Sequence, residues 1–156
     1  MGYYFRLGAQ ILYRDRNEWR VFLFSERRSH FELKADQFIR ISSAEQFVLG
    51  NSTMGIFGQS SELTERGLQL IHSPYIDPYF SGHLKMGIKN LTESTIIIEW
   101  AQIIGKVSFF DISDTYPVEK PESNSIIGKK FRTLGTYEEN TPPLFHYSQD
   151  DGVVYE

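Results

Sequence analysis

Cysteine is absent from this chain of 156 residues, which excludes disulfide bonds and thiolate metal sites. No apolar run reaches the roughly 18 residues of a membrane-spanning helix. The first residues, MGYYFRLG, lack the basic and apolar regions of a signal peptide. The formal net charge of −4 provides no general attraction to nucleic acid phosphates. These absences predict a cytoplasmic protein without a membrane or nucleic acid partner.

Common catalytic and metal-binding signatures are missing as well. The chain has no Walker-type glycine loop and no nucleophile elbow. Its histidines form no i,i+4 pair, so no metal site is predicted; they are His30, His72, His83 and His146. The sequence therefore gives no support for a P-loop nucleotide site, a nucleophile-elbow hydrolase or a histidine metal site.

The residues that are present favour strands. Aromatic residues make up 15% of the chain, and β-branched residues are plentiful. Short alternating segments are separated by turn clusters, a pattern typical of a sandwich or barrel. We predict an all-β fold with strands at 19–25, 37–41, 46–49, 53–57, 67–71, 83–89, 95–100 and 103–109. One short helix is predicted at 60–66, where a serine cap precedes acidic residues.

The composition changes near the end of the chain. No internal boundary is visible before residue 117, so residues 1–116 are predicted to form one β domain. From there to Gly128, Pro, Glu, Ser, Asn and Gly dominate, and the last residues are acidic. Residues 117–156 are therefore predicted to form a flexible C-terminal arm or lid.

The segment Ile76–Asn90, IDPYFSGHLKMGIKN, is the most informative one. Asp77-Pro78 makes a turn, Gly82 relieves crowding, and three apolar residues then alternate with Lys85, Gly87 and Lys89 as in a strand. This pattern resembles the dUTPase/dCTP deaminase superfamily, whose members carry I-D-x-x-[YFW]-x-G and then an alternating strand that ends in Asn.

The resemblance assigns roles within this segment. Asp77 matches the aspartate that contacts the deoxyribose and, in dUTPases, orients the attacking water. Phe80 matches the aromatic residue that packs on the sugar. The deaminase branch has its catalytic glutamate where this chain has Gly87, which would leave room beside the base for a larger one. Independently of the resemblance, Asp77 could cap the turn before Pro78, and Phe80 could be a core residue.

Two further segments extend the resemblance. Phe38–Leu49 looks like the segment that leads to T-x-E, with Ser43 and Glu45 in those two places. GQSSELTERGL resembles the phosphate-binding G-R-S-S motif, with Gln59 in place of its arginine and Ser60 and Ser61 at its hydroxyl positions. A second arginine of the deaminases falls on Thr64 or Glu65, depending on the register. The two serines could equally be a plain helix cap.

Cations elsewhere could compensate for the missing arginine. EWAQIIGKVSFF resembles another strand of the superfamily, with Gly105 and Phe109 in place and Lys106 where many members have glutamine or alanine. GKKFRTLG loosely resembles the deaminase tail that folds over the triphosphate, which makes Lys130 a phosphate ligand. Arg66 is a third candidate. A lysine is a point charge, unlike the planar fork of an arginine, and Lys106 could also be an ordinary exposed residue.

The resemblance implies a distorted jelly roll that assembles as a homotrimer with pockets between subunits. It predicts a deoxynucleoside triphosphate as ligand, Mg²⁺ as an accompanying ion, and Asp77 as the catalytic residue. The substrate-binding candidates are Gln59, Ser60, Ser61, Arg66, Phe80, Lys106 and Lys130.

Two functions remain open at this stage. The first is a divergent nucleoside triphosphate pyrophosphatase, since Gly87 argues against a deaminase. The second is a regulatory or decoy protein without turnover, which would bind a protein partner through Tyr3–Phe5 or residues 145–147. Small divergent members of the superfamily are often viral, so the resemblance also makes a phage source an expectation.

Overall fold

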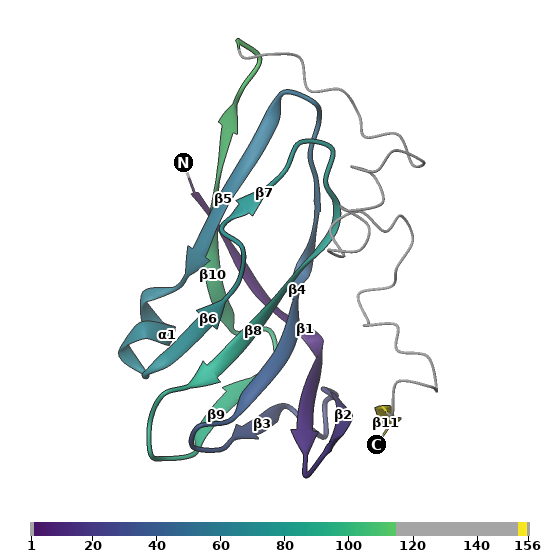
Figure 1. The fold of residues 1–156 in the computed structure, drawn as a ribbon, viewed down its shortest axis with the longest axis vertical. Helices are drawn as coiled ribbons and strands as arrows, with labels where there is room; N and C mark the ends of the chain where they lie inside the picture. Colours follow the sequence, from purple (N-terminus) through teal and green to yellow (C-terminus); the bar gives the residue numbers. More distant parts are fainter. Residues whose placement is uncertain (1, 115–152, 156) are drawn as a thin grey trace.

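The longest strand, β1 (Gly2–Asp15), connects the two halves of the fold in the computed structural model, which describes residues 2–114 and 153–155 (Figure 1). Its first residues pair with β10 (Ile103–Asp111), and its later residues pair with β2 (Glu18–Leu23) and β4 (Phe38–Val48). Gly8 marks the crossing between the two halves, because a Cβ there would lie 2.9 Å from the Ser42 carbonyl oxygen.

A large curled sheet forms around β1 in the order β6-β8-β4-β1-β10-β5-β7. Strand β2 adds to β1, and β3 and β9 form a separate two-stranded sheet. The remaining elements are β3 (His30–Leu33), β5 (Thr53–Gln59), α1 (Ser61–Glu65), β6 (Leu68–Ile71), β7 (Tyr75–Ile76), β8 (Ser81–Asn90), β9 (Ile96–Glu99) and β11 (Val153–Tyr155). None of the helical structure in the described part of the chain is long and apolar enough to cross a membrane.

One continuous apolar core fills the inside of the curl. Phe5 at its centre is fully buried and meets Phe47 and Phe57 edge-on, with ring centroids 6.2 and 5.8 Å away. Gly105 makes room for this ring, since a Cβ there would lie 2.2 Å from Phe5 Cζ and 2.6 Å from the Gly58 carbonyl oxygen. Burial of each large apolar side chain contributes about 1.5–3 kcal/mol, so this cluster is the main source of stability.

The all-β prediction with one short helix is confirmed, and α1 begins at the predicted serine cap. Segments 37–41 and 46–49, predicted as two strands, are one strand, β4. A bulge interrupts its pairing with β8, and Ser43 bridges it: Ser43 Oγ donates to the Glu45 carbonyl at 2.7 Å and accepts from Leu84 N at 2.9 Å.

Four strands were missing from the sequence-based assignment: β1, β3, the two-residue β7, and β11 in the predicted arm. Strand β1 escaped because its pairing shifts register at Phe5/Arg6 and again after Leu7, which breaks the alternation of buried and exposed residues. Strand β3 has only four residues. The arm predicted at 117–156 lies outside the described residues, except for 153–155, which form β11 and pair in parallel with β2.

Candidate functional site

A tight turn, Asp77–Phe80, links β7 to β8 and is fastened to the loop after β4. Phe80 N donates to the Asp77 carbonyl at 3.2 Å, which closes the turn. Tyr79 N donates to the Gly50 carbonyl at 3.2 Å, and Leu49 N donates to the Phe80 carbonyl at 2.8 Å. Tyr79 adopts φ +65°, a left-handed conformation that is unfavourable for a tyrosine. The turn is therefore held in place at some cost in backbone strain.

Replacing Tyr79 by glycine is expected to raise the free energy of unfolding by about 0.5–1 kcal/mol, because glycine adopts positive φ without a steric penalty. Urea unfolding measures the change. Tyr75→Gly in the neighbouring strand β7 is the matched control. It should lower stability, since Tyr75 is not among the residues with positive φ. A loss of stability in Tyr79→Gly would show that contacts of the tyrosine ring outweigh the strain.

Asp77 and Phe80 have different surroundings within this turn. Phe80 is only 5% exposed and packs in the core, which agrees with the alternative that Phe80 is a core residue. Asp77 is half-buried, and within residues 2–114 and 153–155 its carboxylate makes no hydrogen bond or ion pair. Since the backbone carbonyl of Asp77, and not its side chain, closes the turn, the carboxylate has no structural task.

The predicted phosphate motif is engaged in local structure. Gln59 Nε2 donates to Thr64 Oγ1 at 2.5 Å, and Gln59 Oε1 accepts from Leu70 N at 2.8 Å, which ties α1 to β6. Ser60 is the N-cap: its Oγ accepts from Leu63 N at 3.4 Å. Ser61 is the first helical residue and is exposed. Ser60 therefore acts as a helix cap. Of the two serines, only Ser61 presents its side chain to solvent.

The candidate cations are dispersed. Arg66 caps the end of α1, where Nη2 donates to the Ile97 carbonyl and Nη1 lies 3.5 Å from Glu62. Lys106 is exposed on β10, with Nζ 5.5 Å from the centre of the Tyr4 ring. Lys130 lies outside the described residues. Of the two described candidates, Lys106 is therefore the one whose charged group remains on an open sheet face.

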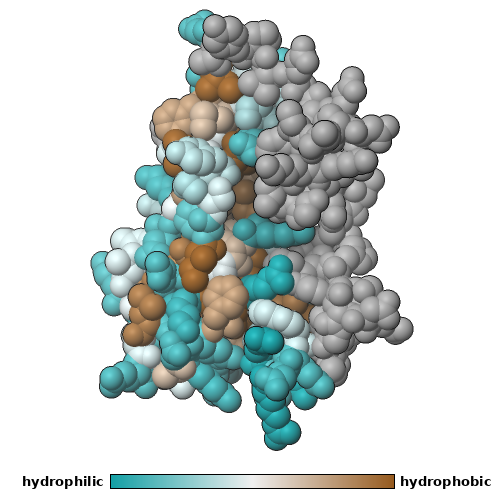
Figure 2. Space-filling model, in the orientation of Figure 1, coloured by the Kyte–Doolittle hydropathy of each residue, from teal (hydrophilic) through white to brown (hydrophobic). Residues whose placement is uncertain are grey.

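Gly87 lies in the middle of β8, directly opposite Arg40 of β4 and Ile71 of β6. A Cβ at this position would lie 2.2 Å from Cε2 and 2.6 Å from Cζ of Phe38, so the Phe38 ring fills the space that a side chain at 87 would take. Apolar atoms interrupt the hydrophilic surface over β6 and β8 in Figure 2. The expected room for a larger base beside Gly87 is therefore wrong.

The strand that resembles the T-x-E segment is also tied down by its side chains. Ser43 is fully buried and bridges the bulge in β4, as described above. Glu45 accepts from Arg6 twice, at 2.7 Å from Nε and at 2.7 Å from the backbone N–H. Both residues therefore stabilise the junction of β1, β4 and β8.

No protein-family model matches the chain. Over 104 residues it is 31% identical to the dUMP-forming dCTP deaminase of Salinispora arenicola and 30% identical to that of Corynebacterium efficiens. Each alignment covers 65% of this chain but 53% and 52% of the relatives, so the chain spans about half their length. The chain belongs to the dUTPase/dCTP deaminase superfamily.

The fold agrees with this membership. A 2′-deoxycytidine 5′-triphosphate deaminase from Agrobacterium tumefaciens superimposes with a TM-score of 0.58 at 13% identity, over 69% of this chain and 38% of the other. The distorted jelly roll predicted for this dUTPase/dCTP deaminase-like chain is confirmed.

A single copy of this dUTPase/dCTP deaminase-like chain does not bring the predicted site residues together. Ile76 pairs with Gly55, which places Asp77 beside Met54 at one end of β5. Ser60 and Ser61 follow the other end, beyond Gln59. Positions 54 and 59 are five residues apart, or roughly 17 Å at about 3.3 Å per residue. A single copy therefore holds Asp77 and the two serines at opposite ends of β5.

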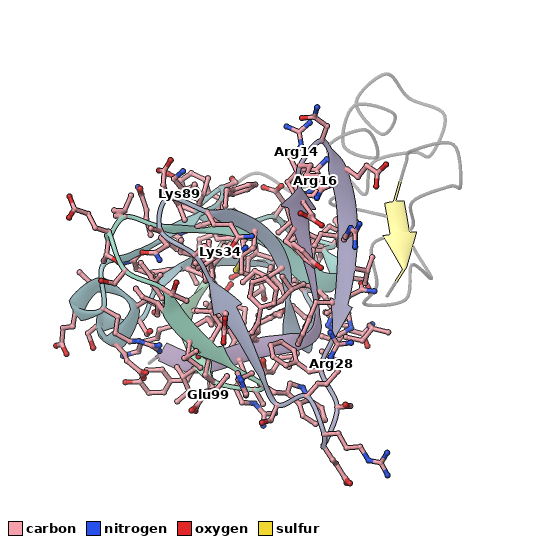
Figure 3. All side chains as sticks on the ribbon, turned by 90° about the horizontal axis from the view of Figure 1, so that it is seen from below. Arg14, Arg16, Arg28, Lys34, Lys89 and Glu99 are labelled. Atoms are coloured by element: carbon pink, nitrogen blue, oxygen red, sulfur yellow. The ribbon has the colours of Figure 1, made fainter. Side chains whose placement is uncertain are left out.

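Within residues 2–114, neither Glu62 nor Glu99 replaces the side chain that β8 lacks at Gly87. Glu62 is paired with Arg66 on α1. Glu99 lies on β9, beside an open groove of about 540 Å³ that it lines with Ser29, His30, Ile97 and Trp100. Glu99 and Lys89 lie on opposite sides of the end view in Figure 3. Glu99 of the same copy therefore cannot act at the Gly87 position.

The electrostatics of the described residues add little to the site. The backbone N–H of Ser113 donates to Asp111 Oδ1 at 2.8 Å and lowers the pKa of this carboxyl from its usual 3.8, but Asp111 ends β10 and only closes a local turn. Within residues 2–114 and 153–155, no three His, Asp or Glu side chains gather to hold a metal ion.

The sequence pattern did not predict Phe38 as the neighbour of Gly87. Its signal was present, because glycine inside a strand often marks the close approach of another group. The alternation of β4 places Phe38, Arg40 and Ser42 on one face, the face that also bears Gly87. The alternation of residues along β4 does not show that β4 pairs with β8, nor in which register, so the contact of Phe38 with Gly87 could not be predicted.

Proposed function

We propose that this chain binds a deoxynucleoside triphosphate and hydrolyses it as a divergent pyrophosphatase of the dUTPase/dCTP deaminase superfamily. The main support is Asp77, whose carboxylate has no structural partner among the described residues and is held in a strained, anchored turn. Strain of this kind persists where the surroundings enforce it, and it is concentrated at functional sites. A carboxylate positioned in this way is suited to orient a water molecule.

The chemistry assigned to Asp77 is simple. Asp77 orients a water whose oxygen forms the new bond to the α-phosphorus and whose proton passes to the carboxylate. The bond from the α-phosphorus to the bridging oxygen breaks, and pyrophosphate leaves with the electron pair. Such a reaction depends mainly on positioning and on charge stabilisation of the phosphates.

Deamination has weaker support. It needs a side chain that moves protons to and from the base, and general acid–base catalysis contributes about 10²–10⁴-fold. On β8 the matching position is Gly87, covered by the Phe38 ring, and its neighbours on the same face are Lys85 and Lys89. None of these groups is a carboxylate that could protonate a leaving ammonia.

We assign the complete site to a homotrimer, in which Asp77 of one subunit faces Ser61 and Lys106 of another. The separation of about 17 Å along β5 supports this arrangement. The outer face of β7, β5, β10 and the start of β1 supports it too. This face carries four large apolar or aromatic side chains that are 39–62% exposed, namely Tyr4, Ile56, Tyr75 and Phe110. Contiguous exposed apolar surface of this kind marks interfaces.

Mg²⁺ would enter this site with its nucleotide. Magnesium is usually held by substrate phosphates and one or two carboxylates, and it keeps several waters. Asp77 offers one such carboxylate. A single carboxylate suits an ion that arrives with the triphosphate, whereas a metal site built by the protein would need more ligands. When bound, the ion would neutralise phosphate charge.

A thermal-shift panel of all deoxy- and ribonucleoside triphosphates, with Mg²⁺ or with EDTA, tests the proposal. A ligand at about 100 times its Kd adds roughly 2.7 kcal/mol to stability, and we expect this for one or more deoxynucleotides. Product analysis should then find pyrophosphate and no ammonia. Ammonia release would identify a deaminase. No shift with any nucleotide would favour the interaction protein, and Tyr3–Phe5 would then be tested for a protein partner.

A further inference from the structure

The outer face of β6, β8 and the first part of β4 presents its side chains in a defined order. Phe38 lies opposite Lys89, Arg40 opposite Gly87, and Ser42 opposite Lys85. On the other side of β8, Gly87 lies opposite Ile71. Since paired residues share a face, Phe38, Arg40, Ile71, Lys85 and Lys89 form one outward surface around Gly87, and Ser42 lies on the same face but is buried.

Phe38 and Gly87 depend on each other. The edge of the ring formed by Cε2 and Cζ occupies the place of a Cβ at 87, so every larger residue there must displace it. Glycine weakens a strand because it leaves nothing to pack, and an aromatic ring laid over it from a neighbouring strand restores the contact. Phe38 nevertheless keeps 37% of its surface exposed. Part of the ring is thus left to meet a ligand.

The charges around the ring are cationic. Lys85, Lys89 and Arg40 project from the same surface, and residues 38–42, 68–71 and 85–89 contain no aspartate or glutamate. Asp36, in the turn before β4, pairs with Lys89 at 2.7 Å. Arg40 lies over the ring of Trp19 at 5.7 Å. With three cations and one acid, the patch favours an anionic ligand.

We infer that Phe38 is the base-stacking surface of the nucleotide site, and that it replaces a base-reading side chain on β8. Because Phe38 pairs with Lys89 at the end of β8 remote from Asp77, the two residues reach one nucleotide from different subunits of the proposed trimer. A nucleotide combines a planar ring with an anionic phosphate chain, and this patch offers an aromatic ring among cations. Every base has a π-face, so stacking tolerates changes of base. The site therefore distinguishes cytosine from uracil weakly. This inference rests on the proposed function and assigns the base contact of that same site.

Phe38→Leu is the test variant, because leucine keeps apolar volume over Gly87 but removes the ring. The probes are the non-hydrolysable α,β-imido analogues of dUTP and dCTP, with affinities measured by calorimetry. The wild type should bind both within about threefold of each other, and Phe38→Leu should bind both about tenfold more weakly, as expected for loss of one stacked base. Phe38→Trp should bind as well as the wild type or better.

Two further variants separate stacking from packing. Trp100→Leu removes a 44% exposed ring that follows β9, away from the proposed trimer face and from the β4–β8 surface, and it should leave affinity unchanged. Gly87→Ala keeps the ring but displaces it, so it should weaken binding while thermal unfolding shows a folded protein.

Unchanged affinity in Phe38→Leu would overturn the inference and leave the proposed function intact. If the wild type binds one of the two analogues more than tenfold more tightly than the other, the claim that the site distinguishes cytosine from uracil weakly is wrong. A wild type that binds neither analogue would overturn both.

Discussion

Replacing Asn90 by alanine is expected to lower the free energy of unfolding by about 3–5 kcal/mol, since it leaves several buried polar groups unpaired at about 1–3 kcal/mol each. Asn90 is fully buried at the end of β8. Its Nδ2 donates to the carbonyls of Leu33, Lys34 and Ser94 at 3.1, 3.0 and 2.8 Å. Its Oδ1 accepts from Thr92 N at 2.9 Å and from Thr92 Oγ1 at 2.8 Å.

This single side chain joins three segments: the end of β3, the end of β8 and the loop that leads to β9. Urea unfolding followed by circular dichroism measures the loss. Asn51→Ala in the exposed turn between β4 and β5 is the matched control, and it should change stability by no more than about 0.5 kcal/mol. A loss below about 1 kcal/mol in Asn90→Ala would mean that water replaces the amide, and that the motif asparagine has another task.

Replacing Asp77 by asparagine is expected to lower the rate of pyrophosphate release by about 10²–10⁴-fold, because the amide cannot accept the proton of the attacking water. The melting temperature should hardly change, since no hydrogen bond or ion pair of the carboxylate is lost among the described residues. Together these two results separate a catalytic role from turn formation, in which the backbone carbonyl of Asp77 takes part.

The control for Asp77 is Asp15→Asn in the β1–β2 hairpin, where the carboxylate lies 3.3 Å from Arg20 and turnover should be unaffected. Steady-state release of pyrophosphate and thermal unfolding are measured on the same samples. Unchanged turnover in Asp77→Asn would remove Asp77 from the mechanism. A large loss of stability would instead show that the side chain supports the turn.

Local pattern was sufficient for several parts of the protein. The alternation in Ile76–Asn90 predicted β8, and Ser60 followed by an acidic turn predicted α1. The same hairpin, with its aspartate, aromatic residue and glycine, pointed to the superfamily. These features depend on neighbours in the sequence, because a strand's two faces and a helix cap are set within a few residues.

Contacts between distant residues required the folded chain. Phe38 and Gly87 are far apart in the sequence, and their contact exists because the register of β4 against β8 brings them together. Asn90 finds its partners in β3 and in the loop before β9. The separation of Asp77 from Ser60 likewise follows from the pairing of β7 with β5. Residue periodicity reports which face of a strand is apolar, but it does not report which strand lies alongside. The pairing of the strands decides where Asp77, Phe38 and Gly87 lie relative to one another.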